Sequence, residues 1–378
     1  MIASPVNVLI LDFRNVISKG SQEVISRHEK YALSLKRITG FDESQITVIG
    51  TTAPGGPIQE SVHLQYFSTK TQKWNLLGYS IKLAIYMKQR KSHSTVLVSG
   101  DPWESAVTAI VARILLKKKI PIQIQIHADI GDELWLKSKP INVVKSWLAR
   151  RTLKFASSIR TTSNNQQEKI LRTYGVSSGI FERIPVQLNL PNSHHLNPER
   201  NQLDSLGLIG RIHKDRGLET ALRVIDIVWQ KYPEVCVLIA GEGPDLEWLK
   251  AELSKISQRG NIQLLGFLES VELEEFWEKC GVLLSTAPAE SFGRAMREAL
   301  VRGIPVLATV SAGSLELNSQ SIEGGIALIN NTDTAEKVLG AYESARMSRV
   351  SKSFIEKLIE ENVVIPDNLA KSWIKMLN

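Results

Sequence analysis

Two arginines lie five positions apart in a glycine-bounded stretch in the second half of the chain. Residues 210–217 read Gly-Arg-Ile-His-Lys-Asp-Arg-Gly, so that Arg211 and Arg216 stand between an apolar run and a helical pattern. A guanidinium group donates two parallel hydrogen bonds to phosphate oxygens, and a helix N-terminus adds further N–H donors. The segment therefore indicates an anion site, although surface arginines beside a glycine turn would give the same pattern.

A second chemical signal is a pair of glutamates, Glu290 and Glu298, in the segment Glu-Ser-Phe-Gly-Arg-Ala-Met-Arg-Glu. The segment lies between a buried apolar run and a helix. We expect backbone N–H groups near Phe292 and Gly293 to face a ligand, with Glu290 beside it and Glu298 accepting hydrogen bonds from ribose hydroxyls. Two solvated acids around a helix start are the alternative, which the position between two apolar runs disfavours.

Weaker signals follow two other apolar runs. Residues 240–244, Ala-Gly-Glu-Gly-Pro, place Glu242 and Gly243 where a backbone could approach a ligand, but a plain turn before a helix is equally consistent with them. His127 ends the run IPIQIQIH and is a candidate for a ligand site. Asp129 follows it closely and could orient His127 or bind a substrate. A strand-end histidine is more often structural, so the residues alone leave both roles open.

These candidates follow short apolar runs that alternate with amphipathic stretches. Continuous apolar runs are typical of strands covered on both faces in a parallel sheet, whereas residues 218–231 repeat apolar positions at helical spacing. The alternation predicts a doubly wound α/β architecture over the full length. We expect strands at 7–11, 45–49, 95–99, 122–127, 158–162, 180–184, 205–210, 235–240, 262–265, 282–285, 305–308 and 326–329.

The chain is long enough for two domains with separate cores. The segment 185–202 breaks the alternation, since it is rich in Pro and Asn and has few apolar anchors. We expect a Rossmann-like domain at 1–190, a linker at 191–202, a second Rossmann-like domain at 203–350 and C-terminal helices at 351–378. The last helix, with an apolar side at Leu369, Trp373 and Met376, could pack back on the first domain. Because ligands bind beyond the carboxyl ends of parallel strands, a central cleft between the two domains is the expected site.

Composition narrows the class of protein. Cys236 and Cys280 are the only cysteines and suit two buried thiols in a reducing compartment; they are too few for a disulfide framework or a cysteine-ligated metal. No run approaches the ~18 apolar residues of a membrane span, and the apolar N-terminus lacks the basic start of a secretory signal. We therefore expect a cytoplasmic protein, or one attached only peripherally to the inner face of the membrane.

Charge is distributed unevenly along the chain. Residues 1–190 hold 26 Lys and Arg against 13 Asp and Glu, a balance of +13, whereas the net charge of the whole chain is +7. Basic residues alternate with Trp, Leu and Phe between residues 134 and 155, including Arg150, Arg151 and Lys154. This mixture suits an anionic membrane surface, or equally a core-packed helix with a solvated face. A lipid-diphosphate acceptor would account for both the charge and a surface location.

The motifs resemble those of a known family. The order GRIHKDRG, IAGEGP, LGFLES and AESFGRAMREALVRGIPVLAT is similar to that of the retaining GT-B glycosyltransferases of family 4, over about residues 204–330. The resemblance implies a GT-B fold of two Rossmann-like domains and transfer from a nucleoside-diphosphate sugar (UDP-, GDP- or ADP-linked) with retention at the anomeric carbon. It also implies no metal and no further cofactor. Polysaccharide biosynthesis, with a glycan or lipid-linked acceptor, is the expected context.

The resemblance also implies roles for individual residues. Arg211 and Arg216 would stabilise the departing diphosphate, Glu290 would hold the donor sugar, and His127 would position the transferred sugar. Arg216 replaces the usual lysine, and the loop after the first strand keeps only Gly20 of the usual glycine pair. The remaining predicted donor contacts are ribose binding by Glu298, nucleobase contacts near Phe267 and Leu268, and backbone or side-chain contacts from Gly210, Glu242, Gly243, Ser291, Phe292 and Gly293.

Three alternatives stay open from the sequence. A nucleotide-sugar 2-epimerase shares this architecture and these donors, but the two arginines with the two glutamates fit transfer better. A nucleic-acid-binding protein would explain the basic half, yet no zinc-ligand spacing, RNP-type motif or helix-turn-helix is evident, so no nucleic-acid partner is expected. A nicotinamide-linked oxidoreductase would require a G-x-G-x-x-G fingerprint after the first strand, which is missing.

Overall fold

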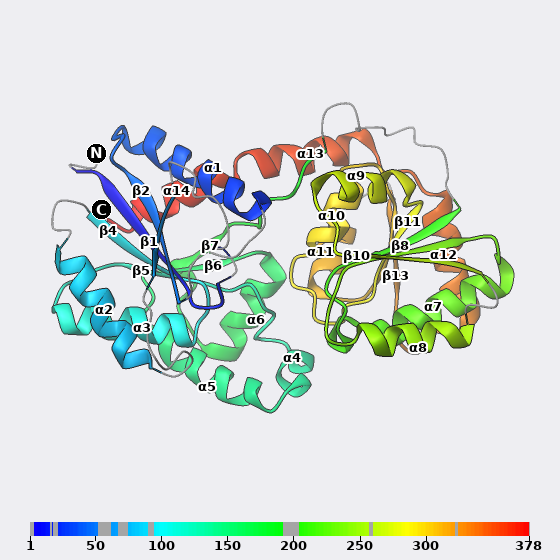
Figure 1. Ribbon diagram of the computed structural model, residues 1–378, viewed down its shortest axis with the longest axis horizontal. Helices are drawn as coiled ribbons and strands as arrows, with labels where there is room; N and C mark the ends of the chain where they lie inside the picture. The colour runs from blue at the N-terminus through cyan, green and yellow to red at the C-terminus, as the bar shows by residue number, and fades with distance from the viewer. Residues whose placement is uncertain are drawn as a thin grey trace. The chain divides into compact units, whose positions relative to one another are not determined.

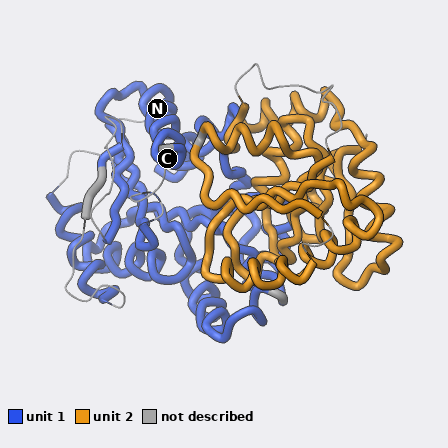
Figure 2. Tube along the Cα trace, turned by 45° about the vertical axis from the view of Figure 1, so that its right-hand side comes forward, with its two compact units in different colours: residues 1–187, 363–378 blue, residues 188–362 orange. Residues whose placement is uncertain are grey.

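The computed structural model describes residues 4–15, 17, 22–51, 62–66, 75–89, 94–191, 204–256, 260–321 and 324–377. The chain divides into two compact units, shown in Figure 2. Unit 1 comprises Met1–Gln187 and Val363–Asn378, and unit 2 comprises Leu188–Asn362. Apart from Pro191, the linker expected at 191–202 lies outside the described residues.

Unit 1 is built on a parallel sheet of strand order β3-β2-β1-β4-β5-β6-β7 (Figure 1). The order reverses between β1 and β4, which makes this the topological switch point where ligands bind in open α/β sheets. The strands are β1 (Val6–Asp12), β2 (Gln45–Gly50), β3 (Val62–Tyr66), β4 (Ser94–Ser99), β5 (Ile122–Gln125), β6 (Ser158–Thr161) and β7 (Phe181–Arg183). The helices are α1 (Gln22–Thr39), α2 (Leu76–Gln89), α3 (Glu104–Leu116), α4 (Glu133–Ser138), α5 (Ile141–Thr152), α6 (Asn164–Tyr174) and α14 (Ile365–Lys375), with short 3-10 turns η1 (Leu153–Phe155) and η2 (Ser178–Ile180).

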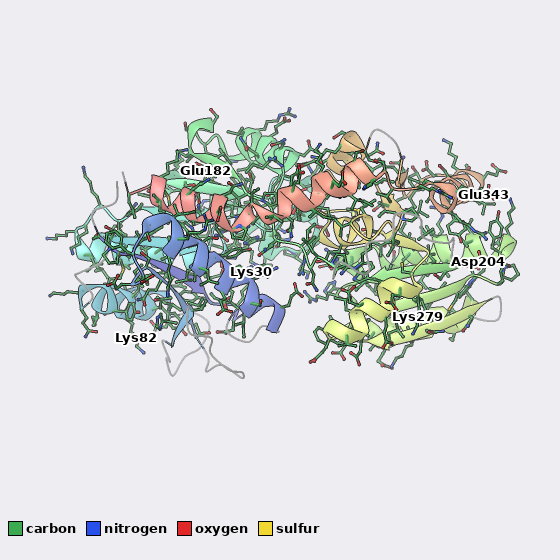
Figure 3. The ribbon with its side chains drawn as sticks, turned by 90° about the horizontal axis from the view of Figure 1, so that it is seen from above. Lys30, Lys82, Glu182, Asp204, Lys279 and Glu343 are labelled. Atoms are coloured by element: carbon green, nitrogen blue, oxygen red, sulfur yellow. The ribbon has the colours of Figure 1, made fainter. Side chains whose placement is uncertain are left out.

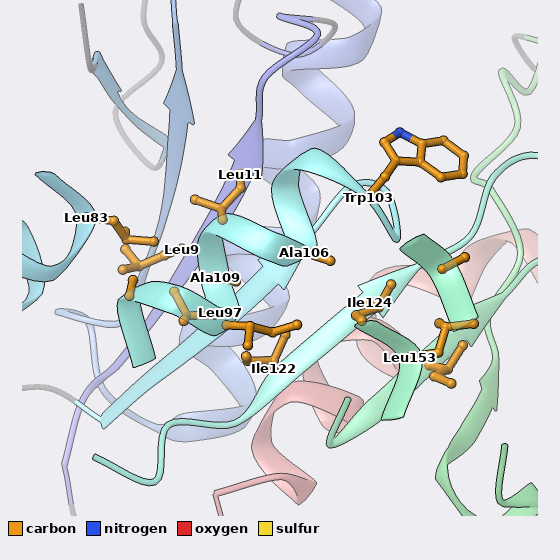
Figure 4. Packing of buried hydrophobic residues seen from close by; sticks show 14 of the residues in the cluster. Leu9, Leu11, Leu83, Leu97, Trp103, Ala106, Ala109, Ile122, Ile124 and Leu153 are labelled. Atoms are coloured by element: carbon orange, nitrogen blue, oxygen red, sulfur yellow. The ribbon is translucent and has the colours of Figure 1, made fainter. Parts of the chain in front are cut away.

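Strand β1 shows why this sheet is covered on both faces. Leu9 and Leu11 pack into the core on the side of α2 and α3, where Leu97, Ile122 and Ala106 also lie (Figure 4). The alternating residues of β1, from Val6 to Ile10, join a second core on the side of α1 and α14. A central strand buried on both faces has no polar side, because successive side chains point to opposite faces.

The C-terminal helix α14 belongs to unit 1, where it packs on α1. Trp373 is fully buried there, and its Nε1 donates to Gln123 Oε1 of β5 at 2.9 Å. Asp367 in the first turn of α14 forms an ion pair with Arg37 of α1. The apolar side of α14 is thus part of the core of unit 1, although the helix lies far from that unit's other elements in the sequence.

Unit 2 repeats the architecture with a parallel sheet of order β10-β9-β8-β11-β12-β13, whose switch point lies between β8 and β11. The strands are β8 (Ser205–Ile209), β9 (Cys236–Ala240), β10 (Asn261–Gly266), β11 (Val282–Ser285), β12 (Val306–Thr309) and β13 (Ile326–Ile329). The helices are α7 (Leu218–Lys231), α8 (Leu246–Ile256), α9 (Ser270–Lys279), α10 (Arg294–Leu300), α11 (Ala312–Gln320), α12 (Ala335–Met347) and α13 (Lys352–Val363), with the 3-10 turn η4 (Lys214–Arg216).

These two units confirm the predicted doubly wound α/β fold with two Rossmann-like halves. Every strand expected from the sequence is present within one or two residues, and β3 is an additional strand. Cys236 and Cys280 are both free thiols, and Cys280 is buried. No helix in the part of the chain that the structure describes has the length and apolar character that a membrane crossing needs.

Candidate active site

A pocket opens at the switch point of the unit 2 sheet, where β8 and β11 end. Gly210 and Arg211 follow β8, and Thr286, Ala287 and Glu290 follow β11; all five line this pocket. The predicted residues Arg216 and Gly293 line it as well. The structure thus brings the arginine loop and the first glutamate together from segments more than 70 residues apart, because the carboxyl ends of adjacent parallel strands meet at one edge of the sheet.

Two glycines allow these loops to lie against one another. Gly217 has φ +74°, and a Cβ there would lie 2.0 Å from the carbonyl oxygen of Thr286. A Cβ at Gly243 would lie 2.0 Å from the carbonyl oxygen of Ile212, whose own N–H donates to the Glu242 carbonyl at 2.9 Å. Any side chain at either position would push the loops apart. The glycines of 210–217 and 240–244 therefore position the arginine loop, and Glu242 contributes through its backbone while its side chain is exposed.

Glu290 is held from two sides. Its Oε2 accepts a hydrogen bond from Arg216 Nη2 at 2.9 Å, and its Oε1 accepts from the N–H of Gly293 at 3.1 Å and, more weakly, from that of Phe292 at 3.4 Å. The sequence predicted that these two N–H groups would face a ligand; in the structure they orient Glu290 instead. Arg216 keeps 42% of its side chain exposed, and Arg211 is also exposed. Both guanidinium groups are therefore within reach of a ligand.

Glu298 occupies a different environment from the one predicted. It is buried in α10 with 6% of its surface exposed. Its Oε1 accepts from the Asn189 N–H at 3.0 Å, and Arg294 Nε lies 2.8 Å from the same oxygen. The carboxylate thus anchors the chain at Asn189 to α10. Its predicted role in ribose binding stays a prediction.

The other predicted donor residues lie outside the lining of this pocket. Phe267, after the edge strand β10, has 60% of its surface exposed, and Leu268 is half-buried. The Gly266 carbonyl accepts from the Gly241 N–H at 2.6 Å, which ties this turn to the glycine loop after β9. Ser291 and Phe292 are buried beside Glu290.

His127 follows β5 in unit 1 and lines a cavity at the carboxyl ends of β1, β4 and β5. Gln123, Gln125 and His127 alternate along one face of this segment and form a polar row. Gln125 Nε2 donates to Gln123 Oε1 at 3.2 Å, and Gln125 Oε1 accepts from Arg160 Nη1 at 3.2 Å. His127 Nε2 lies 3.2 Å from this same oxygen.

This row defines the tautomer of His127. A guanidinium only donates, so the oxygen of Gln125 faces Arg160, and His127 Nε2 must carry the proton that it donates to that oxygen. Desolvation by the surrounding chain and the positive charge of Arg160 lower the pKa of His127, although the ring itself is exposed at the cavity surface. The imidazole is therefore neutral at pH 7, with Nδ1 as its acceptor nitrogen.

Asp129 and Gly20 do not join this site. Asp129, predicted to orient His127 or bind the acceptor, is 1% exposed and pairs with Lys169 Nζ at 2.8 Å. The same lysine pairs with Asp132. The buried carboxylate of Asp129 thus has a counter-ion within unit 1 and needs no acceptor to balance its charge. Gly20 lies outside the described residues. Among the described residues, no cluster of three or more His, Cys, Asp or Glu side chains is arranged to hold a metal ion.

Sequence reasoning missed several residues around the two sites. Thr286 and Ala287 line the unit 2 pocket, and their position directly after an apolar run was an available signal. In unit 1, Arg14, Arg27 and Arg160 line the cavity around His127. Arg160 lies within the strand expected at 158–162, where a buried arginine is unusual, and this could have indicated a functional role.

The region that holds the unit 2 pocket has relatives. Residues 194–353 match the family model described as glycosyl transferases group 1. Over the whole chain, the solved structure of Anabaena HepE in complex with UDP and glucose superimposes with a TM-score of 0.68 and 16% identity, covering 96% of this chain and 99% of that one. This protein has the GT-B fold.

Curated relatives align with parts of the GT-B chain. YqgM of Bacillus subtilis, an uncharacterized glycosyltransferase, is 26% identical over 104 residues, which are 28% of this chain and 29% of that protein. The alpha-monoglucosyldiacylglycerol synthase of Acholeplasma laidlawii is 22% identical over 255 residues, or 62% of this chain and 64% of that one. The chain spans less than a third of the length of the first curated relatives it matches.

Proposed function

We propose that this protein is a retaining glycosyltransferase of family 4 that moves a sugar from a nucleoside-diphosphate sugar to a glycan or lipid-linked acceptor. The observation that carries the proposal is the pocket at the β8/β11 switch point, where Arg211, Arg216 and Glu290 converge. Arg216 Nη2 stands 2.9 Å from Glu290 Oε2 there, so that a cationic and an anionic group lie side by side in the lining of one pocket. A sugar diphosphate presents the two complementary chemistries, phosphate oxygens and hydroxyl groups.

Each group has a distinct part in the proposed reaction. The bond between the anomeric carbon and the diphosphate oxygen breaks, and negative charge develops on the departing diphosphate. An acceptor hydroxyl oxygen forms the new bond on the same face of that carbon, and the proton of this hydroxyl passes to the departing diphosphate. Arg211 and Arg216 stabilise this charge, as preorganised donors do at a developing anion. Glu290, oriented by the N–H of Gly293, accepts hydrogen bonds from sugar hydroxyls. His127, through its unprotonated Nδ1, would accept a hydrogen bond from a hydroxyl of the transferred sugar.

The comparisons support parts of this proposal. The HepE structure, described with UDP and glucose, supports a UDP-linked donor, with GDP- and ADP-linked donors as the other candidates. The name of the Acholeplasma synthase supports a lipid acceptor. No cofactor and no metal is proposed, because the two arginines supply the charge that a divalent ion would otherwise provide. A cytoplasmic location, at or near the inner membrane face, would give access to such donors.

The products of donor turnover test the proposal. With an α-linked UDP-, GDP- or ADP-glucose, the protein should release nucleoside diphosphate, and proton NMR should show the α anomer in the first-formed sugar product. The rate should be unchanged in excess EDTA, and Glu290→Gln should slow it strongly. A first-formed β anomer would contradict retention, and loss of activity in EDTA restored by magnesium would contradict the metal-free chemistry. An epimerised nucleotide sugar formed without acceptor would assign the chain to the epimerases instead.

A further inference from the structure

Unit 1 contains a cavity of about 300 Å³ at its own switch point, lined by the residues that follow β1, β4 and β5. Its walls are of two kinds. Val24, Tyr31, Leu369 and Trp373 supply apolar surface, whereas three arginines supply charge. Such a combination suits a small molecule with an anionic end and a less polar body.

The first of these arginines, Arg160 of β6, is 4% exposed. Its guanidinium donates to the carbonyls of Ile184 at 2.9 Å and Pro185 at 2.6 Å and to Gln125 Oε1. These neutral acceptors fix its position without cancelling its charge. A buried charge without a counter-ion is costly, which makes a compensating ligand favourable.

Arg27 and Arg14 add to this charge. Arg27 of α1 lines the cavity, and its buried Nη1 has no hydrogen-bond partner among the described residues. The Arg14 guanidinium lies 5.5 Å from the centre of the Trp103 ring. Within the described chain, none of the three arginines forms an ion pair with a carboxylate.

The two carboxylates that line the cavity are already engaged by the fold. Asp101 accepts from the N–H groups of Trp103 at 2.9 Å and Ser105 at 3.2 Å and from the Ser105 hydroxyl at 2.8 Å. It thereby caps α3. Asp12 accepts from the Ile17 N–H at 2.7 Å. Hydrogen bonds to these acids therefore serve local structure, and the guanidinium groups of Arg14 and Arg27 remain available to an outside anion.

We propose that this cavity binds a phosphate group carried by the acceptor substrate. The proposal rests on the glycosyltransferase function proposed above and specifies its acceptor class. A phosphate monoester carries close to two negative charges at pH 7 and three acceptor oxygens, which match guanidinium donors. Arg27 Nη1 and the fork of Arg14 hold the phosphate, and the buried charge of Arg160 attracts it from behind. The side chains of Val24 and Tyr31 pack against the body of the molecule.

Phosphate on a soluble polyol and phosphate on a lipid headgroup share this chemistry. The experiment therefore titrates full-length protein with inorganic phosphate, glycerol 3-phosphate and dihexanoyl phosphatidic acid by calorimetry. The Arg211→Ala background is used because this substitution should weaken phosphate binding at the unit 2 pocket. Arg27→Gln is the test variant, with Arg14→Gln as a second one. Lys30→Gln is the matched control, because Lys30 lies one turn further along α1, is exposed, and is labelled in Figure 3.

Phosphate probes should bind the Arg211→Ala protein, with affinity roughly tenfold lower after Arg27→Gln and unchanged after Lys30→Gln. If the protein binds the lipid more tightly than glycerol 3-phosphate, the acceptor is a lipid. If it binds the two with equal affinity, the lipid chains contribute nothing and the acceptor is a soluble phosphate. Absence of phosphate binding, or equal affinities for Arg27→Gln, Arg14→Gln and Lys30→Gln, would overturn the proposal. UDP binding to the protein with Arg211 intact reports separately on the donor site. If UDP does not bind this protein, the proposed function is refuted. If Arg27→Gln abolishes UDP binding, the cavity belongs to the donor and this inference is overturned.

Discussion

At the scale of single residues, two charges at the β8/β11 pocket of unit 2 compensate each other before any ligand arrives. Arg216 and Glu290 form an ion pair, and Gly293 holds the other oxygen of Glu290. A phosphate ligand would therefore compete with Glu290 for Arg216. The geometry of the guanidinium matters here, because a planar fork can contact a carboxylate and a phosphate at once, whereas an ammonium is a point charge.

Substitutions at Arg216 should follow this difference. Arg216→Lys keeps the charge and should lower kcat/KM for the donor only a few-fold. Arg216→Ala removes a charge-assisted contact and should lower it by roughly ten- to a hundredfold. Steady-state kinetics of nucleoside diphosphate release measures both. Equal losses in the two variants would contradict this prediction, because they would show that a positive charge at position 216 does not support turnover without the guanidinium fork.

His28 gives unit 1 a pH dependence. Burial, together with the nearby charges of Arg27 and Arg160, lowers the pKa of His28 to about 4, below its ordinary value of 6.5. Its Nδ1 lies 2.7 Å from the Val24 carbonyl, which requires that Nδ1 carries a proton and donates it. Between pH 6.5 and 4, His28 takes up a proton in the unfolded chain but not in the folded one. The free energy of unfolding therefore falls as the pH falls through this window, by at most about 3 kcal/mol.

The His28→Gln variant isolates this contribution. Glutamine does not titrate, so the melting temperature of the variant should fall less between pH 7 and pH 5 than that of the natural chain. Differential scanning calorimetry at the two pH values makes the comparison. An identical pH dependence in both proteins would mean that His28 is not the group responsible.

At the scale of elements, local sequence patterns predicted the helices and strands, whereas contacts between residues far apart in the chain could not be predicted. Apolar runs and their spacing predicted the strands and helix α7, and the period of two in Val-His-Leu-Gln-Tyr could have predicted β3. The four-residue spacing of Arg294 and Glu298 on one helix could likewise have predicted their contact.

Pairing across the chain carries no such local signal. The contact of Trp373 with Gln123 joins residues 250 positions apart, and that of Asp129 with Lys169 joins different elements. The period of α14 predicted which side is apolar but not what covers it. For the same reason, the arginines around His127 could not be assembled into one site from the sequence, because they come from different elements.

Helix α14 provides a test of this packing. Trp373→Phe keeps most of the buried ring but removes the Nε1 donor to Gln123, a loss worth about 1–2 kcal/mol for a buried hydrogen bond. The melting temperature should fall by roughly 2–8 °C. Trp147→Phe is the matched control, because Trp147 on α5 is 56% exposed and should tolerate the change. Equal melting temperatures in the two variants would contradict the proposed contribution of the hydrogen bond.

At the scale of the whole molecule, the charge imbalance coincides with exposed apolar residues on α5. Val143, Val144 and Trp147 are each more than half exposed, and Arg151 lies 5.3 Å from the Trp147 ring. Apolar side chains beside free cations suit an anionic bilayer better than water. Arg150, expected to share this role, instead donates to the Thr173 carbonyl at 2.7 Å, so it contributes to the fold of unit 1.

Vesicle binding checks this surface. Each nearby cation contributes about 1 kcal/mol, screened within roughly 10 Å at 0.1 M salt. The triple variant Trp147→Ser, Arg151→Ser, Lys154→Ser should bind anionic vesicles at least tenfold more weakly, with unchanged UDP affinity. Lys352→Ser with Lys357→Ser, both exposed on α13, is the control for lost charge. If the natural chain ignores anionic vesicles at low salt, the surface serves another purpose.

The central claim is that the β8/β11 pocket binds a nucleoside diphosphate through its arginines, and isothermal titration with UDP, GDP and ADP measures this directly. One of the three should bind, and Arg211→Ala should weaken it at least tenfold, since a charge-assisted contact is worth roughly 1.5–3 kcal/mol. Arg349→Ala, an exposed arginine of the same unit outside the pocket, should leave the affinity unchanged. If no nucleoside diphosphate binds, or if Arg211→Ala and Arg349→Ala bind it equally well, the donor site is not where this account places it.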